Sequence, residues 1–66
     1  MNIKINGHPV EVDDVTSIAD VVNKKALASE KIVVEHNYRI VSREDWHKAV
    51  LNENDNLEIV SFVGGG

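Results

Sequence analysis

Apolar residues alternate with polar ones on both sides of the dipeptide Asn6-Gly7. Asn-Gly is the preferred pair for a two-residue type I′ turn, because both central residues need a positive φ angle. The alternation predicts a β-hairpin over residues 2–12. Its apolar positions are Ile3, Ile5, Val10 and Val12.

A helical period follows the hairpin. Ile18, Val21 and Val22 are spaced i, i+3 and i+4, which places them on one face of a helix. Thr16 or Ser17 can cap its start, and an end near Lys24 or Lys25 suits the negative end of the helix dipole. A helix this short needs packing against a sheet to persist.

The second half of the chain alternates between extended and turn signals. Ser42 resembles a helix cap, because an acidic residue follows it three positions later. The single turn that it starts would bring Trp46 under the sheet. The predicted segments are a strand from residue 32 to 35, a bend at 36–38, an extended pair at 40–41, a short strand at 49–51, a polar turn at 52–56 and a last strand at 57–63.

This order predicts an α+β protein with the β-grasp (ubiquitin-like) arrangement. We expect a mixed sheet of four to five strands, with one main helix packed on one face and a short helical turn near residues 43–46. In that arrangement the first and last strands are parallel neighbours, and residues 13–56 supply the long crossover that a parallel pair requires. One domain over residues 1–63 would then precede a flexible tail, Gly64–Gly66.

Chain length limits the class of function. With 66 residues, the chain forms at most one domain. A domain of this size buries only about 60% of the surface that its unfolded chain exposes, and its stability is on the order of 3–5 kcal/mol. Little volume remains for an enclosed active site, which argues against a self-contained enzyme.

Composition narrows the setting and the partners. The chain has no cysteine, which excludes a disulfide scaffold, a zinc knuckle and a cysteine nucleophile, and favours the cytoplasm. No segment resembles a signal peptide or a membrane span. Its net charge of −4 argues against nucleic acid binding. The acidic surface serves solubility or docks on a basic partner, and the sequence leaves both possibilities open.

The three terminal glycines carry the most distinctive chemistry. Glycine has no Cβ, so a glycine tail can enter a channel too narrow for side chains. The carboxylate of Gly66 is ionised at neutral pH and is a poor electrophile. Adenylation would convert it to a mixed anhydride, from which a sulfur nucleophile could displace AMP. The alternative is a frayed terminus or a remnant of cloning.

Other polar residues point to structural roles. The spacings of His8, His36 and His47 match no compact metal-ligand motif, so we predict no metal site. His8 falls on the predicted inward parity of the second strand, and His36 sits at a strand end. Adjacent acidic residues at 44–45 diverge on a helix and fit its first turn better than acid–base catalysis. We predict no catalytic residues in this chain.

Strand parity predicts a docking face. In the last strand, Glu58, Val60 and Phe62 share one side, and Glu58 indicates that this side meets solvent. Val60 and Phe62 could form an apolar patch with an outward residue such as Val33 or Tyr38. A covering loop or cross-strand pairing would explain the same pattern.

Residues 32–66 resemble the ThiS family, the sulfur carriers of thiamine thiazole biosynthesis. The shared features are a strand followed by an Asn-containing bend, Ile40-Val41, the segment Ser42-Arg43-Glu44-Asp45-Trp46, a polar turn, an apolar last strand and terminal Gly65-Gly66. The first half agrees in length and topology. Two positions depart from many relatives: Gly64 adds a third glycine, which lengthens the tail, and Ser42 stands where some have proline.

The resemblance implies a carrier that is monomeric when free and binds no cofactor itself. An E1-like adenylyltransferase would use ATP and Mg to adenylate Gly66. A sulfur donor, such as a cysteine desulfurase, would supply sulfur for the thiocarboxylate, and thiazole synthase would receive it. The alternatives are the small subunit of molybdopterin synthase, another ubiquitin-like sulfur carrier, or a ubiquitin-like interaction module with an inert tail.

Overall fold

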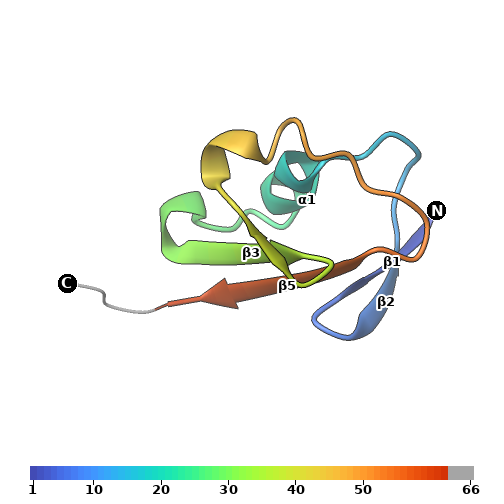
Figure 1. Ribbon diagram of the computed structural model, residues 1–66, viewed down its shortest axis with the longest axis horizontal. Coiled ribbons are helices and arrows are strands. Elements are labelled where there is room, and N and C mark those ends of the chain that lie inside the picture. Colours follow the sequence, from blue (N-terminus) through green and yellow to red (C-terminus); the bar gives the residue numbers. More distant parts are fainter. Residues whose placement is uncertain (63–66) are drawn as a thin grey trace.

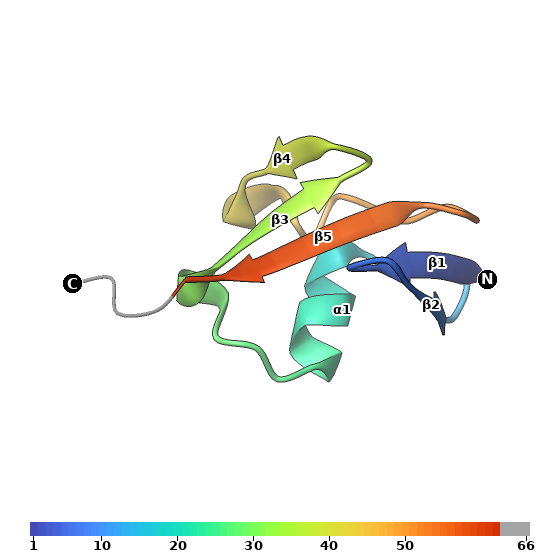
Figure 2. The ribbon, with the colours of Figure 1, turned by 90° about the horizontal axis from the view of Figure 1, so that it is seen from below.

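The computed structural model describes residues 1–62 as a β-sheet, one α-helix and two 3₁₀ turns. The strands are β1 (Asn2–Ile5), β2 (His8–Glu11), β3 (Ile32–His36), β4 (Arg39–Val41) and β5 (Asn56–Ser61); the helix is α1 (Ile18–Lys24), and the 3₁₀ turns are η1 (Ser29–Lys31) and η2 (Arg43–Asp45). The five strands form one sheet in the order β2-β1-β5-β3-β4. Helix α1 lies against one face of it (Figures 1 and 2). We call the opposite face the outer face.

Strands β1 and β5 are parallel neighbours, as the predicted arrangement requires. Lys4 lies opposite Asn56, and Ile5 lies opposite Leu57. The Asn6 side chain extends this pairing past the end of β1: its Nδ2 donates to the Ile59 carbonyl oxygen at 3.1 Å, and its Oδ1 accepts from the Ile59 amide at 2.7 Å. Asn6 therefore has two roles: it forms the hairpin turn, and its side chain holds β5 by hydrogen bonds. The sequence pattern predicts only the turn.

Reciprocal capping starts α1 where the sequence predicts it. The Ser17 hydroxyl accepts from the Asp20 amide at 3.1 Å, and the Asp20 carboxylate accepts from the Ser17 amide at 3.0 Å. Two of the otherwise unpaired amides at the helix start are thereby satisfied. Ile18, Val21 and Val22 are buried, so the predicted apolar face is the packed one.

The core fills the space between α1 and the inner face of the sheet. Trp46 reaches it from the segment after η2, and its Nε1 donates to the Val41 carbonyl oxygen at 2.9 Å. This hydrogen bond satisfies the indole N–H, which is the only polar group of the Trp46 side chain. The buried apolar residues are Ile3, Ile5, Ile18, Val21, Val22, Ile32, Val34, Trp46, Leu51 and Leu57.

Some predicted local features differ in the structure. Ser42 precedes η2, but its side chain makes no capping hydrogen bond there. The segment 49–51 forms no strand; Val50 makes a single antiparallel bridge with Ser17. His8 has the predicted parity of Val10, yet it is exposed because it borders the hairpin turn.

Asp55 organises the polar turn before β5, and sequence analysis gave it no role. Its carboxylate accepts from the Asn52 amide at 2.8 Å and from Asn37 Nδ2 at 3.1 Å, and lies 2.7 Å from His36 Nε2. Only 8% of Asp55 is exposed. Burial raises the pKa of Asp55, but the hydrogen bonds from His36, Asn52 and Asn37 outweigh it and hold the pKa below its usual value.

This lowered pKa predicts acid lability. Because the folded pKa of Asp55 lies below the unfolded one, its contribution to stability is complete above the unfolded pKa and is lost as pH falls through the folded pKa. Asp55→Asn should remove about 1–2 kcal/mol at neutral pH and flatten the acid limb of the stability curve. Urea unfolding between pH 2 and 7 measures both effects. The control is Asp45→Asn, which removes an exposed ion pair with Lys48 and should change stability by less than about 0.5 kcal/mol. If Asp55→Asn loses stability with falling pH as steeply as the wild type, the assignment is contradicted.

Candidate functional site

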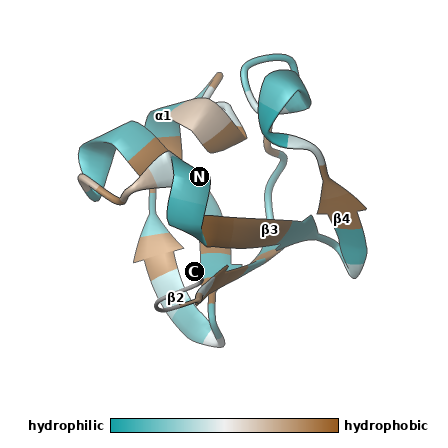
Figure 3. Ribbon diagram, turned by 90° about the vertical axis from the view of Figure 1, so that its left-hand side faces the viewer, coloured by the Kyte–Doolittle hydropathy of each residue, from teal (hydrophilic) through white to brown (hydrophobic). Residues whose placement is uncertain are grey.

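The outer face carries an apolar patch beside the end of β5. Val60 lies directly opposite Val33 of β3, and Phe62 follows two residues later on the same side. We call Val33, Val60 and Phe62 the apolar patch. Figure 3 shows the hydrophobic run along β3 and a second hydrophobic stretch in β4. The predicted parity of Glu58, Val60 and Phe62 is confirmed, because the intervening Leu57 and Ile59 face the core.

The apolar patch is open among the described residues. Val60 is 58% exposed, Phe62 47% and Val33 37%, so no loop of residues 1–62 covers them. The cross-strand pairing of Val33 with Val60 exists, but it leaves both side chains in contact with solvent. Exposed apolar side chains gathered in this way are typical of partner surfaces.

Tyr38 lies outside this patch. It sits in the β3–β4 turn, and its hydroxyl accepts from Asn56 Nδ2 at 3.0 Å, at the start of β5 and away from Val60. Ile40 is an apolar outer-face residue that sequence analysis did not identify. It is 71% exposed and lies opposite Glu35. Its place depends on the β3–β4 register, which the sequence pattern does not specify.

Phe62 is held at the point from which the tail begins. Its amide donates to the Lys31 carbonyl oxygen in η1 at 2.9 Å. The backbone beside the apolar patch is therefore tied to a second element as well as to β3. The predicted carrier residues Gly64, Gly65 and Gly66 lie outside the described residues.

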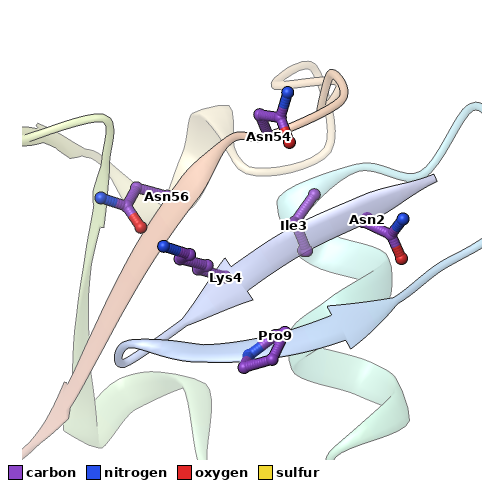
Figure 4. A pocket seen from close by; sticks show the side chains of 6 residues that line it. All are labelled: Asn2, Ile3, Lys4, Pro9, Asn54 and Asn56. Carbon is purple, nitrogen blue, oxygen red and sulfur yellow. The ribbon is translucent and has the colours of Figure 1, made fainter.

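Two glutamates of the outer face lie on neighbouring strands. Glu58 lies opposite Glu35, and neither forms an ion pair within residues 1–62. Farther along the sheet, Lys4 extends toward Asn56 beside an open hollow of mixed polar and apolar lining (Figure 4). Its lining residues are Asn2, Ile3, Lys4, Pro9, Asn54 and Asn56.

The histidines are dispersed. His8 and His47 are exposed, whereas His36 is partly buried against Asp55, in the structural role predicted for a strand end. Within residues 1–62, no three histidine or acidic side chains are grouped so that they could hold a metal ion. No helix in this part of the chain is long and apolar enough to span a membrane.

Comparisons with known proteins place this geometry in a family. The model of the ThiS family matches residues 3–66. The sulfur carrier protein ThiS of Bacillus subtilis is 35% identical over 65 residues, which are 97% of this chain and 98% of that protein. The crystal structure of a thiamine biosynthesis protein (ThiS) from Geobacter metallireducens superposes with a TM-score of 0.85 at 29% identity, covering 100% of both chains.

Larger proteins contain a similar segment. The thiazole synthase of Magnetococcus marinus is 38% identical to this chain over 66 residues. That match covers 100% of this chain but only 20% of the synthase, so the chain spans a fifth of the length of that relative. The thiazole synthase of Paramagnetospirillum magneticum shows the same coverage at 32% identity.

Proposed function

Because the chain belongs to the ThiS family, we propose that it carries sulfur for thiazole formation as a thiocarboxylate on Gly66. It is a small sulfur carrier protein of thiamine biosynthesis with the β-grasp fold of its relatives. The family match carries the proposal: it runs along nearly the whole chain and includes Gly65 and Gly66. The apolar patch and the tail are then parts of one device, in which the patch docks and the tail reacts.

The carboxylate of Gly66 has no good leaving group, so it must be activated before sulfur can replace one of its oxygens. A carboxylate oxygen of Gly66 attacks the α-phosphorus of ATP, bound with Mg in an E1-like adenylyltransferase, and pyrophosphate leaves. A sulfur nucleophile then attacks the acyl carbonyl, and AMP leaves with the bonding electrons of the C–O bond. With hydrosulfide as the nucleophile, the product is the thiocarboxylate itself. With a persulfide from a donor such as a cysteine desulfurase, the product is an acyl disulfide; a thiol reductant must then supply two electrons to break its S–S bond and release the thiocarboxylate. The chain acts as a co-substrate throughout, and its partners supply the catalytic groups.

Thiazole synthase is the proposed acceptor. Two proteins of that name contain a segment that is similar to this chain over its full length. A segment placed in the same polypeptide reaches its neighbour at a high effective concentration, which is useful when the two act on each other. We propose the cytoplasm as the location of the chain, because a small domain without disulfides is typical of a reducing compartment.

The test is a single-turnover conversion. With the adenylyltransferase, ATP, Mg and sulfide, the intact mass of the chain should rise by the difference between sulfur and oxygen. The product should then pass sulfur to thiazole synthase and return to its initial mass. An unchanged mass, with a partner that demonstrably converts another carrier, would refute the proposal.

A further inference from the structure

Two glutamates face each other at the centre of the outer face. Glu35 of β3 and Glu58 of β5 are register partners on the side opposite the core. Side chains in this relation have their Cβ atoms about 4.5–5.5 Å apart. Both residues are partly buried, and neither has a cation in an ion pair within residues 1–62.

Such a pair opposes folding of the free chain. Like charges directly opposite each other on neighbouring strands repel, and partial burial reduces the screening by water and salt. Lys4, the outer-face cation of β1, lies opposite Asn56 and forms no ion pair with Glu58 in the described part of the chain. Lys4 is a diagonal neighbour of Glu58, whereas no cation of residues 1–62 forms an ion pair with Glu35, so a positive charge from another molecule would favour the pair.

The tail determines which molecule comes close. Phe62 is tied to Lys31, and only four residues separate it from the carboxylate of Gly66. Four residues span at most about 13–14 Å when fully extended. An enzyme that receives this carboxylate must therefore bring its own surface within that reach of Phe62, and the apolar patch is the exposed apolar surface at that place. Glu58 is two residues from Val60 on the same face, so the same surface meets the glutamates.

A second copy of this chain does not fit this position. A two-fold dimer centred on these glutamates would bring the acidic pair of one copy against the same pair of the other. The net charge of −4 adds repulsion between copies. A heterologous, locally basic surface is complementary to the face.

We propose that the enzyme that adenylates the tail docks on the outer face and inserts an arginine or lysine side chain between Glu35 and Glu58, with apolar groups over Val60 and Phe62. This inference rests on the proposed function. It assigns the paired glutamates to recognition: their repulsion weakens the free chain and is relieved in the complex. Arginine suits the position best, because its planar guanidinium can serve two carboxylates at once.

The test is the variant Glu35→Gln/Glu58→Gln, which keeps the shape of both side chains. In ATP–pyrophosphate exchange with the adenylyltransferase, the KM for the chain should rise about 10-fold while kcat stays within about 2-fold, since the reacting carboxylate is untouched. The wild-type kcat/KM should fall with salt more steeply than that of the variant. The urea midpoint of the free variant should be higher than that of the wild type.

The matched control is Asp13→Asn/Glu44→Gln. It removes the same two charges from exposed positions away from the outer face and should leave KM unchanged. If the wild type is adenylated but Glu35→Gln/Glu58→Gln has the wild-type KM, the docking inference is overturned and the proposed function stands. If the control raises KM equally, net charge rather than this pair attracts the partner, and the inference is again overturned. If the wild type is never adenylated, the proposed function itself fails.

Discussion

Gly65→Val is expected to abolish thiocarboxylate formation without changing the stability of the domain. A Cβ with two methyl groups beside the reacting carbonyl prevents the tail from entering a channel shaped for bare backbone, and valine is restricted to fewer backbone angles than glycine. A misplacement of about 1 Å at a reacting centre can cost about 100-fold in rate. We therefore expect at least about a 100-fold loss of kcat/KM in pyrophosphate exchange.

Two companion variants make this result specific. Gly64→Ala adds a single methyl group one residue farther from the carbonyl and should lose less than about 10-fold. Deletion of Gly66 shortens the tether and should abolish the reaction while leaving binding to the adenylyltransferase detectable. A Gly65→Val chain that is converted to thiocarboxylate at the wild-type rate would contradict a narrow channel. A Gly66 deletion that retains full thiazole formation would favour an interaction module.

Local sequence patterns predicted the elements of this fold well where the signal is itself local. Asn6-Gly7 marks the first turn, Ser17 lies at a predicted cap position, and the i, i+3, i+4 spacing selects the buried face of α1. The parallel pairing of β1 with β5 was expected from the β-grasp arrangement that the order of elements matches, and the structure confirms it. The turn, the cap and the helix face depend on backbone angles and side-chain periodicity over a few residues.

Features that depend on distant partners were not predicted. Asp55 looks like one more residue of a polar turn until His36 and Asn37 are placed beside it. The Asn6 side chain reaches Ile59, far along the sequence. A one-residue change of register would turn every side chain of a strand to the other face. The parity of side chains within one strand can therefore be predicted from sequence, whereas the register between strands that are distant in sequence cannot.

The same limit applies to the candidate site. Val60, Phe62 and Glu58 were found because they share one strand. Glu35 was missed as the partner of Glu58, because that relation requires the β3–β5 register. The charged half of the outer face is thus a property of the fold, while its apolar half is already visible in the sequence.

Leu57→Ala should have the largest effect on stability. Leu57 is fully buried in β5, between Ile5 of β1 and His36 of β3, so its truncation leaves a cavity that two neighbouring strands must close. A buried Leu→Ala change costs about 2–5 kcal/mol. A domain of this size has on the order of 3–5 kcal/mol in total. A large fraction of Leu57→Ala chains should therefore be unfolded at 37 °C, which circular dichroism and urea titration measure.

Val60→Ala, on the same strand but 58% exposed, should separate stability from docking. It should change the free energy of unfolding by less than about 1 kcal/mol and raise the KM of the adenylyltransferase, because it removes contact area from the apolar patch. Leu57→Ala should instead lower the active fraction in proportion to unfolding, and an osmolyte that restores folding should restore its activity. If Leu57→Ala stayed folded with unchanged stability, Leu57 would not belong to the core. If Val60→Ala unfolded the domain, the outer face would be structural, and the division of β5 into a buried side that supports the tail and an exposed side that presents it would be wrong.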